Sequence, residues 1–209
     1  MPLLDLVKNI CVLFAFGCVA TPLTPAPQLN SAKPTLLILE KNEGERRVVR
    51  GYPGHPDAGE TFILKVDPKN GASSHLVLFT AETSGRGGEI ETHNHPSSDE
   101  ILFFQSGTAR VDLGDAARVV HAGATVFIPA GTPISVDNIG KEGISLVCVF
   151  SAPGFEDFMR AASALEGEKK GPMSKAEDDE IQRMYTHDVI YQQPQIGLPC
   201  LVSHLPHFA

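Results

Sequence analysis

The feature that most constrains the fold is a series of short runs between residues 36 and 150, each with alternating apolar and polar positions. Gly, Pro, Asn and Asp separate the runs. A period of two places alternate side chains on opposite faces of a strand, and many short strands with turn residues between them are typical of sandwiches and barrels. We therefore predict an all-β domain. The predicted strands are 36–40, 46–50, 60–66, 74–81, 89–95, 100–105, 107–113, 116–121, 124–129, 133–138 and 143–150.

The acidic charge balance narrows the classes of partner. The chain has 209 residues and a formal net charge of -8, and no run of basic residues is longer than two. Nucleic acids and anionic membrane surfaces are bound through clustered Lys and Arg, so we expect neither as a partner. No continuous apolar stretch reaches the roughly 18 residues that a spanning helix needs, so we also expect no membrane span.

The first 20 residues differ from the rest of the chain. Lys8 precedes an apolar run from Ile10 to Ala20, which is too short to cross a bilayer but suits the core of a secretory signal. We predict a signal peptide over 1–20 and a secreted or periplasmic protein. Two alternatives stay open: a lipid anchor on Cys18, and a buried amphipathic helix in a cytoplasmic protein.

The remaining boundaries follow composition and periodicity. Apolar residues recur at helical spacing from Phe155 to Leu165, and Ser174 with Glu177 has the spacing of a capping box before a second helix. The predicted segments are a Pro-rich linker at 21–35, the β-barrel at 36–152, a helical extension at 153–190 and an irregular tail at 191–209.

Two cysteines lie after the predicted leader. Cys148 falls in an apolar strand pattern, where a free thiol behaves as a small buried hydrophobic residue. The alternative is a disulfide between Cys148 and Cys200, formed in an oxidising compartment.

The residues with a clear chemical pattern flank a predicted turn at 96–99. His93 and His95 are two apart on one strand, so both side chains point to the same face. Glu100 begins the returning strand and can face the two imidazoles if the strands pair. Two neutral imidazoles and a carboxylate are a ligand set for a divalent metal. On the returning strand, one face carries Glu100, Leu102 and Phe104, and the other carries Ile101, Phe103 and Gln105.

Glycines and prolines at fixed spacing surround these residues. The first motif reads Gly87-GEIET-His93-Asn94-His95-PSSD-Glu100-ILFFQS-Gly107. The second reads Gly123-ATVFI-Pro129-Ala130-Gly131-TP-Ile134-SVD-Asn138. Together they resemble the two motifs of the cupin superfamily, specifically the single-domain cupins similar to quercetin dioxygenases. Every position matches except the second-motif histidine, which is Ile134 here, and the resemblance covers residues 45–165.

This resemblance implies a double-stranded β-helix, the jelly-roll cupin barrel of two antiparallel sheets, with helices after it. It implies that His93, His95 and Glu100 bind one metal inside the barrel. The fourth family ligand is absent, because Ile134 cannot coordinate. His121, just before the second motif, stays open as a more remote ligand.

Three functions follow from the resemblance. The first is a metal-dependent, dioxygenase-like oxidoreductase acting on a small organic molecule that is aromatic or enolisable, with Glu100 as ligand and catalytic base. Fe(II) is the foremost metal, with Mn, Ni, Cu and Zn as alternatives. The second is a non-catalytic cupin that holds a small ligand, and the third is a sugar isomerase or epimerase. The resemblance also implies a homodimer.

Overall fold

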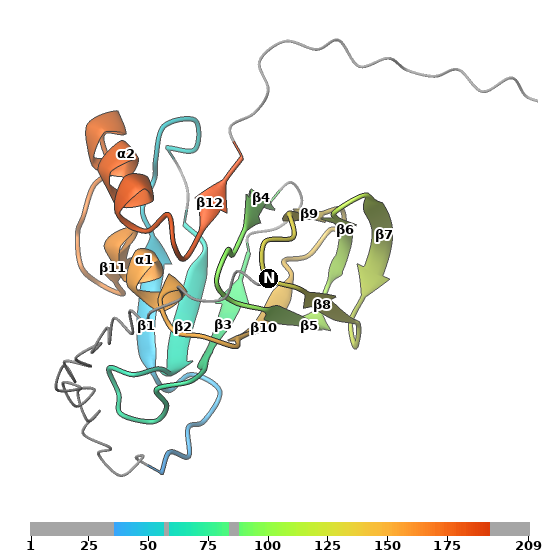
Figure 1. Ribbon diagram of the computed structural model, residues 1–209, viewed down its shortest axis with the longest axis horizontal. Coiled ribbons are helices and arrows are strands. Elements are labelled where there is room, and N and C mark those ends of the chain that lie inside the picture. The colour runs from blue at the N-terminus through green and yellow to red at the C-terminus, as the bar shows by residue number, and fades with distance from the viewer. Residues whose placement is uncertain (1–35, 57–58, 84–87, 193–209) are drawn as a thin grey trace, which may run out of the picture. The chain divides into compact units, whose positions relative to one another are not determined.

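A computed structural model of the chain describes residues 36–56, 59–83 and 88–192 (Figure 1). Several predictions concern residues outside this described part. They are the signal peptide at 1–20 with Cys18, the linker at 21–35, Gly87 of the first motif, Cys200, and the tail beyond residue 192.

The predicted all-β domain is confirmed, and ten of the predicted runs form strands. Their ends lie close to the predicted ends because Gly, Pro and Asp interrupt the alternation there. The strands are β1 Glu45–Val49, β2 Thr61–Val66, β3 Val77–Glu82, β4 Glu89–Asn94, β5 Glu100–Ser106, β6 Thr108–Leu113, β7 Ala116–His121, β8 Thr125–Ile128, β9 Ile134–Asn138 and β10 Ser145–Phe150.

The predicted strand at 36–40 is wrong. This run is irregular, and the side chains of Leu36 and Ile38 are almost fully exposed. A strand needs a neighbouring strand for its backbone hydrogen bonds and a core for its apolar face. The prediction for 36–40 rests on its alternation of apolar and polar residues alone, and among the described residues this run has neither a neighbouring strand nor a core to cover.

The helical extension contains two helices, as expected, and two short strands that return to the sheets. The first helix ends at Ala161, before the predicted Leu165, and Ser163–Leu165 pair with β1 instead. The Arg47 guanidinium donates hydrogen bonds to the carbonyls of Arg160 (3.0 Å) and Ser163 (3.3 Å) at this point. None of the described helices is long and apolar enough to cross a membrane. The elements are α1 Phe155–Ala161, β11 Ser163–Leu165, α2 Lys175–Met184 and β12 Ile190–Tyr191.

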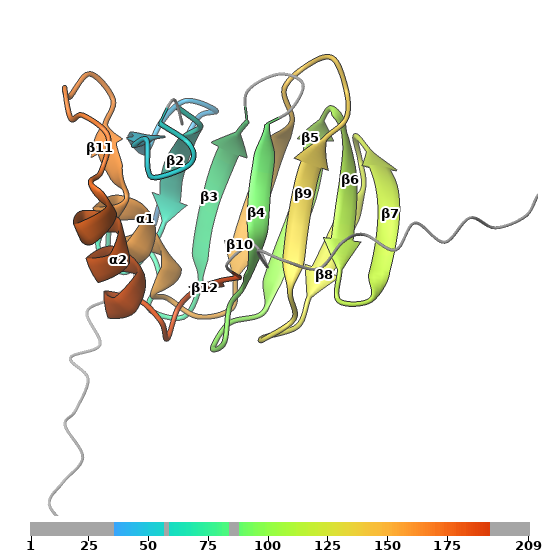
Figure 2. The same ribbon diagram turned by 90° about the horizontal axis from the view of Figure 1, so that it is seen from above.

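The strands form two antiparallel sheets that stack as a jelly-roll sandwich. One sheet has the order β11-β1-β2-β3-β10-β5-β8 and the other β12-β4-β9-β6-β7. Within the described residues, strand pairing joins neighbours inside each sheet only, so the sandwich is not the closed barrel that we expected. Figure 2 shows α1 and α2 at the end of the sandwich beside β2 and β11.

The core lies between the two sheets and continues under α1. Strand β5 follows the predicted alternation: Glu100, Leu102 and Phe104 are buried, and the residues between them are exposed. Gly107, which ends the first motif, has a φ of 92°, and a Cβ atom there would lie 2.5 Å from Ile144 Cγ2. Only glycine fits this turn, so the motif spacing reflects how tightly β5 turns into β6.

Candidate metal centre

Strand β4 and the residue after it carry the two predicted imidazole ligands. His93 and His95 are 5% and 2% exposed, respectively. His93 Nδ1 lies 2.7 Å from the Glu91 carbonyl oxygen, and His95 Nδ1 lies 2.7 Å from the Asp188 carbonyl oxygen. A carbonyl oxygen only accepts, so Nδ1 carries the proton in both rings and Nε2 keeps its lone pair for a metal.

The turn at residues 96–99 places Glu100 opposite the imidazoles. The backbone N–H of Gly131 donates to the His95 carbonyl (2.8 Å), and the N–H of Ala130 donates to the Asp99 carboxylate (2.9 Å). Both donors belong to the second motif. The Pro-x-Gly turn of that motif therefore braces the turn that holds two of the three candidate ligands.

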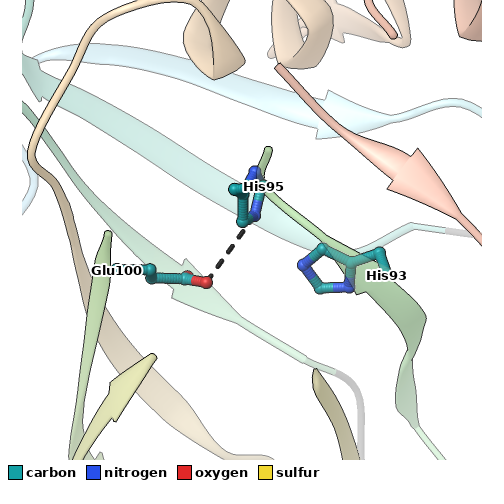
Figure 3. A group of neighbouring side chains, drawn as sticks. All are labelled: His93, His95 and Glu100. Atoms are coloured by element: carbon teal, nitrogen blue, oxygen red, sulfur yellow. Dashed lines mark ion pairs between the residues drawn. The ribbon is translucent and has the colours of Figure 1, made fainter. Parts of the chain in front are cut away.

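The structure brings His93, His95 and Glu100 together (Figure 3). Their ligand atoms lie within 4.8 Å of one another, and His95 Nε2 is 3.6 Å from Glu100 Oε2. These last two atoms are buried and have no hydrogen-bond partner among the described residues. Buried polar atoms without a partner are costly, and a cation between them would satisfy both. The residues therefore fit a divalent metal.

Burial also controls the protonation of this cluster. It raises the pKa of Glu100 from 4.5 to about 8. It lowers the pKa of His95 from 6.5 to about 3, with a further contribution from neighbouring His93, whose own pKa is lowered by burial. Without a cation the cluster is thus uncharged near neutral pH. A metal would displace the Glu100 proton and bind the carboxylate.

Ile134 occupies the place of the missing family ligand. It is 1% exposed, pairs with His93 across β9 and β4, and lines the same cavity as His93 and Glu100. This side chain therefore faces the interior. His121, by contrast, is exposed on β7, where its Nδ1 lies 3.2 Å from Thr108 Oγ1. It does not reach the cluster.

A cavity of about 170 Å³ opens from the cluster between the two sheets. Strands β2 and β3 supply Phe62 and Phe79, and the C-terminal extension supplies Phe155, Phe158 and Tyr191. Sequence reasoning missed this role of the extension. The helical spacing of the phenylalanines signals that they are buried, but not that they line a cavity beside the cluster of His93, His95 and Glu100.

A second group of ionisable side chains also escaped the sequence analysis. His55 Nε2 lies 2.8 Å from Glu91 Oε1 and 3.9 Å from Glu89 Oε1, and all three side chains are at least partly exposed. The loop residue His55 is distant in sequence from β4, so spacing gave no signal for this contact.

Comparison with known proteins agrees with this geometry. Residues 82–150 match the family model described as "Cupin domain". A segment of 78 residues is 36% identical to mannose-1-phosphate guanylyltransferase 2 of Escherichia coli O157:H7, covering 36% of this chain and 16% of that protein. A segment of 67 residues is 30% identical to an uncharacterised protein of Methanocaldococcus jannaschii, covering 32% of this chain and 54% of that protein. The chain thus spans about half or less of these relatives.

Solved structures with similar folds include three cupin-like chains. A predicted oxalate decarboxylase from Thermotoga maritima aligns at 14% identity and a TM-score of 0.49, over 56% of this chain and 100% of that one. KdgF from Halomonas sp. aligns at 16% identity and a TM-score of 0.41, over 47% of this chain and 84% of that one. A recombinant oxalate oxidase in complex with glycolate aligns at 24% identity and a TM-score of 0.41, over 49% of this chain and 55% of that one.

Two stacked antiparallel sheets hold a buried His-His-Glu cluster between them. Residues 82–150, which include all three residues of the cluster, match the family model of the cupin domain.

Proposed function

We propose that the protein is a metal-dependent, dioxygenase-like oxidoreductase that acts on a small organic molecule. The observation that carries the proposal is the pair of buried, unpartnered atoms His95 Nε2 and Glu100 Oε2, in a cluster of which His93 and Glu100 line a largely apolar cavity. Three ligands leave positions open for substrate and dioxygen, as in other sites with two histidines and a carboxylate.

His93, His95 and Glu100 would hold the ion, with Fe(II) foremost and Mn, Ni, Cu or Zn as alternatives. When bound, the metal supplies Lewis acidity and, if redox-active, electron transfer to dioxygen. The Nδ1–H groups of both imidazoles hold the rings in place through backbone carbonyls. Ile134 lines the cavity with an apolar side chain and supplies no ligand. Glu100, besides acting as a ligand, would accept a proton from the substrate.

A second function is favoured by one observation, the replacement of the family histidine by buried Ile134. A cupin that has lost catalysis would keep the cavity and bind a small ligand without turning it over. The third function, a sugar isomerase or epimerase, has less support. No Lys or Arg lines the cavity among the described residues, so a sugar phosphate would find no cation there.

The test of the proposed function is metal content. His93→Ala, His95→Ala and Glu100→Gln should each reduce bound metal from about one equivalent to a small fraction of it, because each variant removes one of three ligands. Elemental analysis of the purified variants measures this. His121→Ala is the matched control, since it removes an exposed histidine outside the cluster. Equal metal content in all four variants would contradict the proposal.

A further inference from the structure

We infer that the cavity takes a single aromatic ring carrying a short alkylammonium group, and that it discriminates against carboxylates of the same shape. This inference rests on the proposed function, because the ligand would occupy the cavity that opens from the metal cluster. It is carried by the aromatic walls, by the carboxylates that line the cavity, and by the lack of cationic side chains among the described lining residues.

The walls suit one aromatic ring. Tyr191 lies against His93 with ring centroids 5.4 Å apart, and Phe158 lies 5.8 Å from Tyr191. Phe155 continues the row at 5.6 Å from Phe158. An apolar cavity of about 150 Å³ is known to take benzene. The 170 Å³ here therefore holds a ring of that size, with a short substituent that reaches beyond the apolar part.

The polar part of the lining is acidic. Glu60 lies just before β2, Glu82 ends β3, and Glu89 and Glu91 lie at the start of β4, while α2 contributes Asp178. Four of these carboxylates thus come from one end of the sandwich. Within the described residues no Lys or Arg pairs with any of the five. His55, which lies against Glu91 and Glu89, is the one described basic side chain with such a contact.

One of these carboxylates also binds a tyrosine that lines the cavity. Tyr52 Oη donates a hydrogen bond to Glu91 Oε1 at 3.3 Å. Burial, with the negative charges of Glu91 and Glu60, raises the pKa of Tyr52 well above its usual range. An ammonium group meets aromatic faces and carboxylates, both of which attract it, whereas an anion meets repulsion.

The test compares three probes of one shape and different charge: 2-phenylethylamine, 2-phenylethanol and 3-phenylpropionate. Binding is measured by calorimetry at neutral pH, on metal-loaded and on metal-free protein. On metal-free protein we expect the amine to bind roughly tenfold more tightly than the alcohol, which corresponds to about 1.4 kcal/mol, and the acid to bind most weakly. On metal-loaded protein the open coordination positions would bind the carboxylate and raise the affinity of the acid. Added salt should reduce the advantage of the amine, because it screens the partly exposed carboxylates.

A double variant, Glu60→Gln with Glu82→Gln, removes two charges from the cavity and leaves the metal cluster intact. This variant should reduce the difference in affinity between the amine and the acid, and it should bind as much metal as the parent protein. The matched control is Glu142→Gln with Glu180→Gln, which removes two charges from exposed positions that do not line the cavity. This control should leave the ranking of the probes unchanged.

The outcomes separate the inference from the proposed function. If the acid binds as tightly as the amine to metal-free protein, or if none of the probes binds, the inference is overturned and the metal-dependent function stands. If the protein retains no metal but ranks the probes as expected, the inference stands and the proposed function fails.

Discussion

Ile134 is the residue at which the sequence departs from the cupin motifs that it resembles. Its side chain is buried beside His93 and leaves the cluster with three ligands. An imidazole at this position would face the same point as the other ligands. The residue thereby controls how firmly a metal is held and how many coordination positions stay open to other molecules.

We predict that Ile134→His strengthens metal retention. The side chains are similar in volume, so overpacking should cost less than about 1.5 kcal/mol, although a buried imidazole without a metal adds a further cost of about 1–3 kcal/mol. The rate of metal loss to a chelator should fall by roughly tenfold or more, since a fourth ligand must dissociate. Ile134→Leu, which adds no ligand, is the control and should lose metal as fast as the parent. Equal rates in all three proteins would show that residue 134 does not face the metal.

Glu100 gives the metal-free protein a distinct pH dependence. Its pKa is about 8 when folded and near the ordinary 4.5 when unfolded. Between these values the unfolded chain has lost a proton that the folded protein keeps, so stability falls as pH rises. The lowered pKa of His95 acts in the opposite sense below pH 6.5 and adds nothing above it. From pH 6.5 to 8, the contribution of Glu100 is therefore not offset by His95.

We accordingly expect the Tm of metal-free protein to decrease between pH 6.5 and 8. Metal-loaded protein should lack this contribution, because the bound carboxylate is ionised in both states, so the Tm difference caused by metal grows with pH. Thermal denaturation at several pH values measures both. Metal-free Glu100→Gln serves as the control and should lose the decrease. A decrease of the same size in this variant would assign the effect to another group.

At the scale of elements, the segment from α2 to β12 acts as a support for the metal cluster. It supplies the Asp188 carbonyl that holds His95, and β12 pairs with β4 beside His93. The loop that precedes α1 fits closely against it: Gly154 has a φ of 136°, and a Cβ atom there would overlap the Asp188 carboxylate. The position of one imidazole thus depends on a loop and a helical segment far from it in sequence.

This dependence predicts that Gly154→Ala weakens metal binding. The substitution places a side chain at a backbone conformation that costs about 1–3 kcal/mol and displaces Asp188. Loss of the hydrogen bond that holds His95 should reduce metal affinity by roughly tenfold. This is the lower end of the range seen when the hydrogen-bond partner of a metal ligand is removed. Gly167→Ala is a matched control, because its φ is 85° but nothing lies within 4 Å of an added Cβ. It should cost stability and leave metal affinity unchanged.

The same elements show how far the sequence could predict the molecule. Alternation and turn residues identified β5 and the buried face that carries Glu100, because those signals are local. The run at 36–40 had the same alternation but no partner strand. The ends of α1 and the strands β11 and β12 depend on contacts such as that of Arg47 with Arg160, which are separated by more than a hundred residues. The aromatic cover of the cavity has the same non-local origin.

At the scale of the whole molecule, the outer face of the seven-stranded sheet is unusually apolar. Phe127 on β8 is 56% exposed and pairs with Ile101 on β5, which is 40% exposed, as is Phe103. Val147 and Val149 on β10 continue the patch beside them. None of the outward-facing side chains of β5, β8 and β10 is charged. Exposed apolar patches of this kind mark interaction sites, and we propose that this one pairs with a second copy of the chain.

We expect the full chain to be a dimer in solution and Phe127→Glu to shift it to monomer. A carboxylate at the centre of a buried apolar contact should weaken the dimer by roughly 30-fold or more, the effect of losing about 2 kcal/mol. Sedimentation analysis over a concentration series measures the change. Val119→Glu, which places the same charge on the exposed face of the opposite sheet, is the control and should leave the dimer intact. Dissociation by Val119→Glu but not by Phe127→Glu would move the interface to the five-stranded sheet, and a parent chain that is monomeric at all concentrations would contradict the dimer itself.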